Sequence, residues 1–116
     1  MWALVRRLVR RPPQEAVVLN LALDLAQDWG SDFGKPVVPR LRARYPWLSE
    51  RQLQGVEDTV QAAKTAAHAS VARLERVGGK MPDFRAFRRD FGPGHAWVNR
   101  ANLHRLYAQS CYFASK

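Results

Sequence analysis

A stretch without proline, from residue 49 to residue 77, constrains this chain more than any other feature. Apolar residues recur in it at steps of three or four, which is the spacing of one face of an α-helix. Ser49 and Gln52 have the spacing of a capping box, in which each side chain satisfies a backbone N–H at a helix start. Gly78-Gly79 supplies a stop, because glycine adopts the left-handed conformation at low cost. The apolar positions are Leu53, Val56, Val60, Ala63, Ala67, Val71, Leu74 and Val77.

These signals predict one helix roughly 40 Å long, and the predicted fold class is all-α. A chain of 116 residues suits a single-domain helical bundle organised around this long central helix. We expect a basic N-terminal helix in residues 1–13, core helices in 14–79 and basic helices in 80–116. The five predicted helices span residues 2–10, 14–29, 37–45, 50–77 and 83–114, the last broken at 92–94. The helices at 14–29 and 50–77 are expected to form the core.

Residues 1–11 have the pattern of a short amphipathic helix, which Pro12-Pro13 ends. Its apolar side is expected to dock on the bundle. Two alternatives remain, a helix lying on a membrane surface and a basic arm lying on nucleic acid. Membrane attachment is the less favoured, because so short a helix buries little apolar area. The apolar side holds Trp2, Leu4, Val5, Leu8 and Val9, and the basic side holds Arg6, Arg7, Arg10 and Arg11.

The charge of the chain is the composition value that bears most on function. Lysine and arginine exceed aspartate and glutamate by 19 to 10, which gives a net charge of +9. An excess of this size favours polyanionic partners: nucleic acid, an anionic membrane face or an acidic protein. Residues 80–116 hold seven basic residues against Asp83 and Asp90. The C-terminal third is therefore where we expect a polyanion to bind.

Residues 37–60 are expected to form a short helix, a tight turn and the start of the long helix. This segment resembles a helix-turn-helix unit. It also resembles the paired helices of ubiquitin-binding CUE domains, through Tyr45-Pro46 and Leu53. Neither resemblance extends beyond the segment, and a recognition helix usually ends after a few turns, whereas this one continues to Val77.

In the C-terminal third, a short helix beginning after Asp83 carries two stripes. Phe84, Phe87 and Phe91 recur at steps of three and four and are expected to anchor the helix. Arg85, Arg88 and Arg89 lie on another side. Three aromatic anchors on so short a helix fix where the guanidinium groups point, so the sequence predicts a phosphate-binding ridge.

The last helix is expected to start near His95, after a Gly-Pro-Gly turn, and to carry a polar stripe on its exposed side. We expect Arg100 and Arg105 to contact phosphates, and Tyr112 to stack on a base. Asn102 and Gln109 would position the strand, because amides can bond base edges or phosphates. The exposed stripe is Asn102, Arg105, Gln109, Tyr112 and Lys116, and the inward residues are Leu103, Leu106, Tyr107 and Phe113.

No arrangement of residues predicts an active site, so we expect no enzyme activity, no cofactor and no metal. His68, His95 and His104 lack the spacing of zinc ligands. His104 and Cys111 share one side of the last helix, which is typical of ordinary packing. The single cysteine excludes an internal disulfide and favours a reducing cytoplasm. The apolar runs fall short of a membrane span, and the N-terminus lacks the pattern of a secretory signal.

The leading hypothesis is a non-catalytic nucleic-acid-binding module, an accessory subunit of a larger nucleoprotein complex. The sequence leaves open whether the nucleic acid is DNA or RNA. The first alternative is an adaptor that docks an acidic protein partner, with Trp2, Trp47 and Trp97 as interface anchors. The second alternative is a helix-turn-helix transcriptional regulator that uses residues 37–60.

Overall fold

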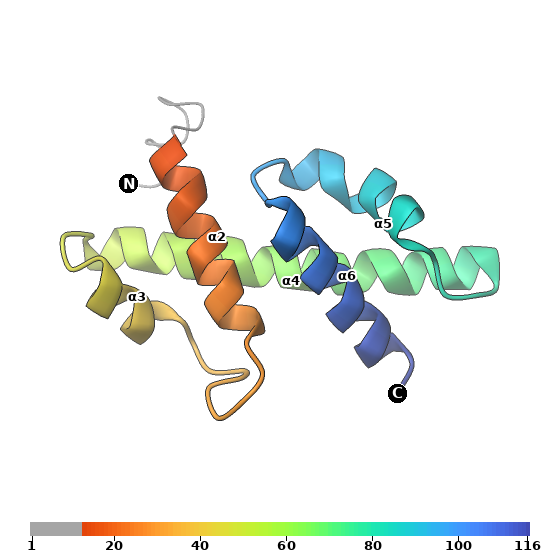
Figure 1. Cartoon of the computed structure of the whole chain (residues 1–116), viewed down its shortest axis with the longest axis horizontal. Coiled ribbons are helices and arrows are strands. Elements are labelled where there is room, and N and C mark those ends of the chain that lie inside the picture. Colours follow the sequence, from red (N-terminus) through yellow and green to blue (C-terminus); the bar gives the residue numbers. More distant parts are fainter. Residues whose placement is uncertain (1–12) are drawn as a thin grey trace. The chain divides into compact units, whose positions relative to one another are not determined.

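The computed structural model describes residues 13–116, and these residues form an all-α structure without strands (Figure 1). The predicted fold class is therefore confirmed for this part of the chain. The helix predicted over residues 2–10 lies outside the described residues. In order, the elements are α2 (Pro13–Gln27), α3 (Val38–Arg44), α4 (Glu50–Gly78), α5 (Phe84–Phe91), the 3-10 helix η1 (Gly92–His95) and α6 (Arg100–Ala114). No helix among them is long and apolar enough to cross a membrane.

The long helix α4 begins and ends as its sequence predicts. The backbone N–H of Ser49 donates to Gln52 Oε1 at 2.9 Å, and the N–H of Gln52 donates to Ser49 Oγ at 3.0 Å. Gly79 terminates the helix with a φ of +76°, and its N–H donates to the Glu75 carbonyl at 2.8 Å. The apolar face is buried from Leu53 to Val71, whereas Val77 is 80% exposed.

The described residues form two compact units, residues 13–61 (unit 1) and residues 62–116 (unit 2), and their boundary falls within α4. In unit 1 the core comes from α2, α3 and the first part of α4. The Glu57 carboxylate of α4 lies at the start of α3, where its Oε1 accepts from the N–H groups of Val37 at 2.6 Å and Val38 at 3.0 Å. The apolar core of this unit is Val18, Leu19, Ala22, Leu23, Ala26, Val37, Leu41, Leu53, Val56 and Val60.

Helix α2 differs from its prediction in two respects. It ends at Gln27 and not at residue 29, and Trp29 is exposed in the following loop, stacked on Phe33 with ring centroids 4.5 Å apart. The sequence pattern of this helix also predicts a polar strip that includes Gln27, but Gln27 is fully buried, while Val17 is exposed. Because α2 is apolar around most of its circumference, its sequence pattern does not fix which side faces the core.

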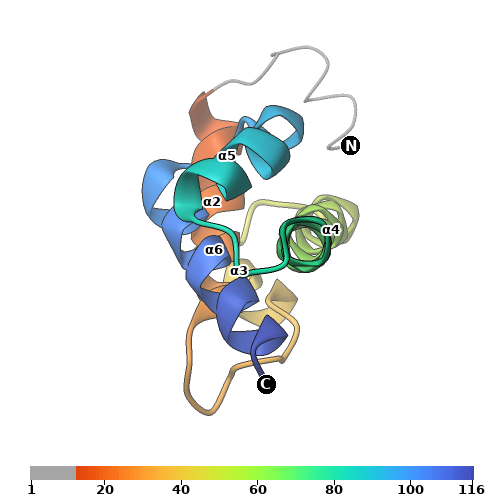
Figure 2. The same cartoon turned by 90° about the vertical axis from the view of Figure 1, so that its right-hand side faces the viewer.

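In unit 2, α5 and α6 lie on the same flank of α4, as seen in Figure 2, where α4 is viewed nearly end-on. Asp90 of α5 joins α5 to α4: its carboxylate accepts from Ser70 Oγ at 2.6 Å and forms an ion pair with Arg73, both on α4. The last helix starts at Arg100 and not near His95. Residues 92–95 form the 3-10 helix, and Asn99 caps α6, with its Oδ1 accepting from the Asn102 N–H at 2.8 Å.

Candidate nucleic-acid interface

Helix α5 is fixed in orientation by its cap and by two buried rings. Asp83 Oδ1 accepts from the N–H of Ala86 at 2.8 Å, as an N-cap residue does. Phe87 and Phe91 are buried, and their rings stack with centroids 5.1 Å apart. The predicted anchoring of α5 by phenylalanine is confirmed for these two residues, while Phe84 is half-buried.

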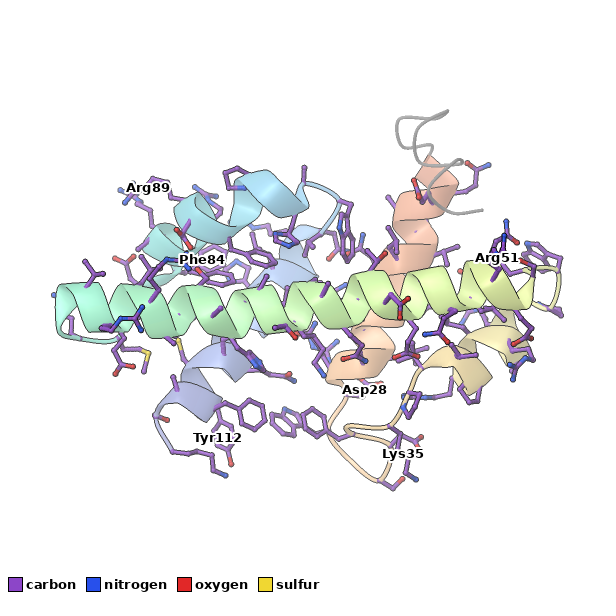
Figure 3. The ribbon with its side chains drawn as sticks, turned by 180° about the vertical axis from the view of Figure 1, so that it is seen from behind. Asp28, Lys35, Arg51, Phe84, Arg89 and Tyr112 are labelled. Carbon is purple, nitrogen blue, oxygen red and sulfur yellow. The ribbon has the colours of Figure 1, made fainter. Side chains whose placement is uncertain are left out.

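Arg85, Arg88 and Arg89 are exposed on the outer side of α5, and we call them the arginine ridge. They line one surface hollow of about 310 Å³. Figure 3 shows Arg89 pointing away from the helices, with Phe84 on the inner side of α5. None of the three forms an ion pair with a carboxylate of residues 13–116. Their guanidinium groups are therefore available to an external anion.

The two carboxylates closest to the ridge in sequence are already engaged. Asp83 accepts the N-cap hydrogen bond of α5, and Asp90 is held by Ser70 and Arg73. Both carboxylates therefore already accept hydrogen bonds from other groups of unit 2.

An apolar groove continues from the ridge towards the end of α4. Leu74, Ala86, Arg89 and Asp90 line a hollow of about 280 Å³. Leu74 and Ala86 also line the next groove, of about 450 Å³. The remaining residues of that larger groove are Val77, Gly78, Lys80, Met81, Pro82 and Asp83. Unit 2 thus presents a basic surface and an apolar surface next to each other.

The polar stripe predicted on α6 is wrong for its two amides. Asn102 is only 2% exposed and Gln109 only 6% exposed, so neither side chain lies on the outer surface. Ser110 is buried as well, whereas Phe113, which was expected to face inward, is exposed. The buried side of α6 therefore includes two amides and a serine, residues that hydrophobicity alone would place on the outer surface.

The other predicted residues of α6 occupy different surroundings. Arg100 is exposed in the first turn, and Arg105 is half-buried. Tyr112 is exposed, and Lys116 Nζ lies 4.8 Å from the centre of its ring. Figure 3 shows Tyr112 and Arg89 on opposite sides of the α4 ribbon. The structure thus brings together Arg85, Arg88 and Arg89, but it does not place Tyr112 beside them.

His104 is a surface residue, packed against the helix that carries the ridge, that the sequence pattern did not single out for binding. Its ring stacks on Phe84 of α5, with centroids 3.9 Å apart and planes inclined by 11°. The side chain is exposed on α6, one turn after Arg100. The signal that could have identified it is this i, i+4 spacing from Arg100, which places both side chains on one side of the helix.

The remaining titratable groups of unit 2 have structural surroundings. His68 is half-buried and packs against Phe113, and burial lowers its pKa. Burial raises the pKa of the Cys111 thiol and of Tyr107. Within residues 13–116 no group of three or more His, Cys, Asp or Glu side chains is placed to hold a metal ion.

Most of the net charge of the protein belongs to unit 2. Residues 62–116 contain ten lysines and arginines against three acidic residues, a net charge of +7, and residues 1–61 contain nine against seven, a net charge of +2. The arginine ridge therefore lies in the strongly basic part of the chain.

Comparison of the chain with protein-family models, with curated proteins and with solved structures finds no match.

Proposed function

We propose that the protein is a non-catalytic nucleic-acid-binding module, an accessory subunit of a nucleoprotein complex, and that the arginine ridge binds the phosphate backbone. The observation that carries this proposal is the ridge itself: three exposed arginines on one anchored helix, lining one hollow and without a carboxylate partner in residues 13–116. Arginine presents a planar fork of donors that matches phosphate oxygens. Arg100 adds a further cation in the same unit.

The burial of Asn102 and Gln109 removes the side chains that we expected to contact base edges. Contacts to phosphate position a protein on nucleic acid but carry no sequence information. The proposed binding is therefore independent of sequence and sensitive to salt. A reducing compartment that contains nucleic acid, such as the cytoplasm, suits this activity and the free thiol of Cys111.

Fluorescence anisotropy with labelled DNA and RNA at low salt tests the proposal. The ridge variant, Arg85→Glu, Arg88→Glu and Arg89→Glu, is expected to lose binding. Its matched control is Arg44→Glu, Arg51→Glu and Arg76→Glu, three exposed arginines outside the ridge, which changes the net charge by the same amount. Binding that is absent from the unmodified protein, or lost equally in both variants, would contradict a specific role for the ridge.

The apolar groove favours a second candidate, an adaptor that docks an acidic protein. Val77 is 80% exposed at this groove, and Lys80 also lines it. In unit 1, Trp47 is 74% exposed and lines a separate hollow of about 280 Å³ with Val17 and Tyr45. A partner that stays bound after nuclease treatment, and is released by Val77→Asp, would support the adaptor; release by nuclease alone would contradict it.

A further inference from the structure

The stack of His104 on Phe84 offers a flat aromatic surface at the junction of α5 and α6. The two ring planes are nearly parallel and their centroids are 3.9 Å apart. His104 is exposed, while Phe84 is half-buried beneath it. One face of the imidazole therefore rests on Phe84, and the exposed side remains open to a planar ligand.

The ring beneath His104 is held in place from inside unit 2. The Tyr107 ring meets Phe84 edge to face at 5.5 Å, and the Phe87 ring lies 6.4 Å from it. The Tyr107 hydroxyl donates to the Pro82 carbonyl at 2.8 Å, just before α5 begins. A surface held in this way binds without first losing conformational freedom, which is the advantage of preorganisation.

Cationic side chains border this stack on both helices. Arg88 follows Phe84 by one turn of α5, and Arg100 precedes His104 by one turn of α6, so each lies one helical turn from a ring of the stack. Both arginines are exposed. Two exposed cations that can hold phosphates thus lie one helical turn from the stack.

His95, in the same unit, also stacks on a phenylalanine ring, but its surroundings differ from those of His104. Its ring lies on Phe91 with centroids 4.0 Å apart and planes inclined by 3°. However, His95 is half-buried, and its Nδ1–H donates to the Phe91 carbonyl at 3.0 Å. It therefore covers a core ring and caps a carbonyl. His104, in contrast, is exposed.

We infer that the His104–Phe84 stack is a platform for one unstacked base, so that this surface binds single-stranded nucleic acid in preference to duplex. The inference rests on the proposed function of the arginine ridge. In a duplex the bases stack on one another and offer no free face. In a single strand, an unpaired base can stack on an aromatic side chain, histidine included, while arginines hold the backbone.

Anisotropy with three labelled DNA probes of about 12 nucleotides, within the range of known site sizes, tests this inference. The probes are a single strand, a duplex of the same sequence and an abasic strand that keeps the phosphates. The protein is expected to bind the single strand most tightly. His104→Ala is expected to lower that affinity about fivefold or more, the low end of the loss for one base–aromatic stack, and to leave the affinities for the other two probes unchanged.

Two further variants test whether the loss of affinity in His104→Ala comes from the loss of stacking. His104→Tyr keeps an aromatic ring and is expected to restore binding of the single strand. His95→Ala removes the other stacked histidine and is expected to leave all three affinities unchanged. Equal binding of the single strand and the abasic strand, or an equal loss on all probes in His104→Ala, would overturn the inference. If the proposed function of the ridge is wrong, the result differs, because none of the three probes then binds at low salt.

Discussion

Phe87 determines where the arginine ridge points. Its side chain is completely buried, and its ring contacts those of Phe84, Phe91 and Tyr107. Because Arg85, Arg88 and Arg89 alternate with these phenylalanines on a helix of 8 residues, their directions follow from the packing of the rings. The core of unit 2 therefore positions the ridge on its surface.

Replacing Phe87 with alanine should destabilise unit 2 strongly. Removing a fully buried phenylalanine side chain costs about 3–5 kcal/mol, because the transfer free energy is lost and a cavity remains. Urea denaturation followed by circular dichroism measures the change in the free energy of unfolding. Val77→Ala, at an exposed position, should stay within about 0.5 kcal/mol. Equal stability of the two variants would show that Phe87 is not an anchor.

His68 makes the stability depend on pH. Its pKa is lowered by burial first and by the charge of Lys64 second. The unfolded chain therefore binds the proton more readily than the folded protein, so stability present at neutral pH is lost as the pH falls below the ordinary histidine pKa of about 6.5. The urea midpoint should drop between about pH 7.5 and about pH 5, around that pKa. In His68→Gln the drop should be smaller, and an equal drop would contradict this assignment.

At the scale of single residues, the sequence predicted exposure well where a residue has one preferred environment. The arginines of the ridge are exposed, and Leu53, Val56 and Val60 are buried. The prediction of exposure was wrong for Asn102, Gln109 and Gln27, because an amide side chain can lie in water or pack against polar groups inside the protein. The pairing of His104 with Phe84 joins two helices and has no local sequence signal.

At the scale of elements, α3 depends on a carboxylate that comes from another helix. It is a helix of only 7 residues, and no side-chain cap of its own satisfies its N-terminus. Glu57 of α4 supplies the acceptor for the N–H groups of Val37 and Val38, and Gln61 Nε2 donates to the other oxygen at 2.9 Å. A negative charge is also favoured at a helix N-terminus.

Glu57→Ala should therefore destabilise unit 1. Each buried N–H left without an acceptor costs roughly 1–3 kcal/mol. Glu57→Gln keeps an acceptor and should cost less. Urea denaturation gives both values, and Asp58→Ala, at the neighbouring exposed position, is the control. A Glu57→Ala protein as stable as this control would show that the carboxylate does not hold α3.

Elements with capping residues at both ends were predicted best. Ser49, Gln52 and Gly79 define α4, and each makes the contact that its type predicts. The predicted helix boundaries are wrong where more than one residue could end or begin the helix. Gly30 suggested that α2 continues to residue 29, and the glycines of 92–94 suggested that α6 follows at once. In the structure Asn99 caps α6, and an asparagine cap is only one of several starts that the sequence allows.

At the scale of the whole molecule, the charge is concentrated in unit 2, where residues 62–116 have a net charge of +7. A net charge of this size draws polyanions to a protein whether or not a defined site exists. We propose instead that binding depends on contacts of Arg85, Arg88 and Arg89 with phosphate groups. The dependence of affinity on salt separates the two explanations, since each bound phosphate contributes to the slope.

The slope of the logarithm of the binding constant against the logarithm of salt concentration tests this central claim most directly. Each phosphate contact adds about 0.7 to the slope for a single strand. Replacing the three ridge arginines with alanine should therefore reduce the slope by about 2, whereas Arg44→Ala, Arg51→Ala and Arg76→Ala should leave it nearly unchanged. The same reduction in both variants would contradict the claim, because binding would then follow total charge and not the ridge.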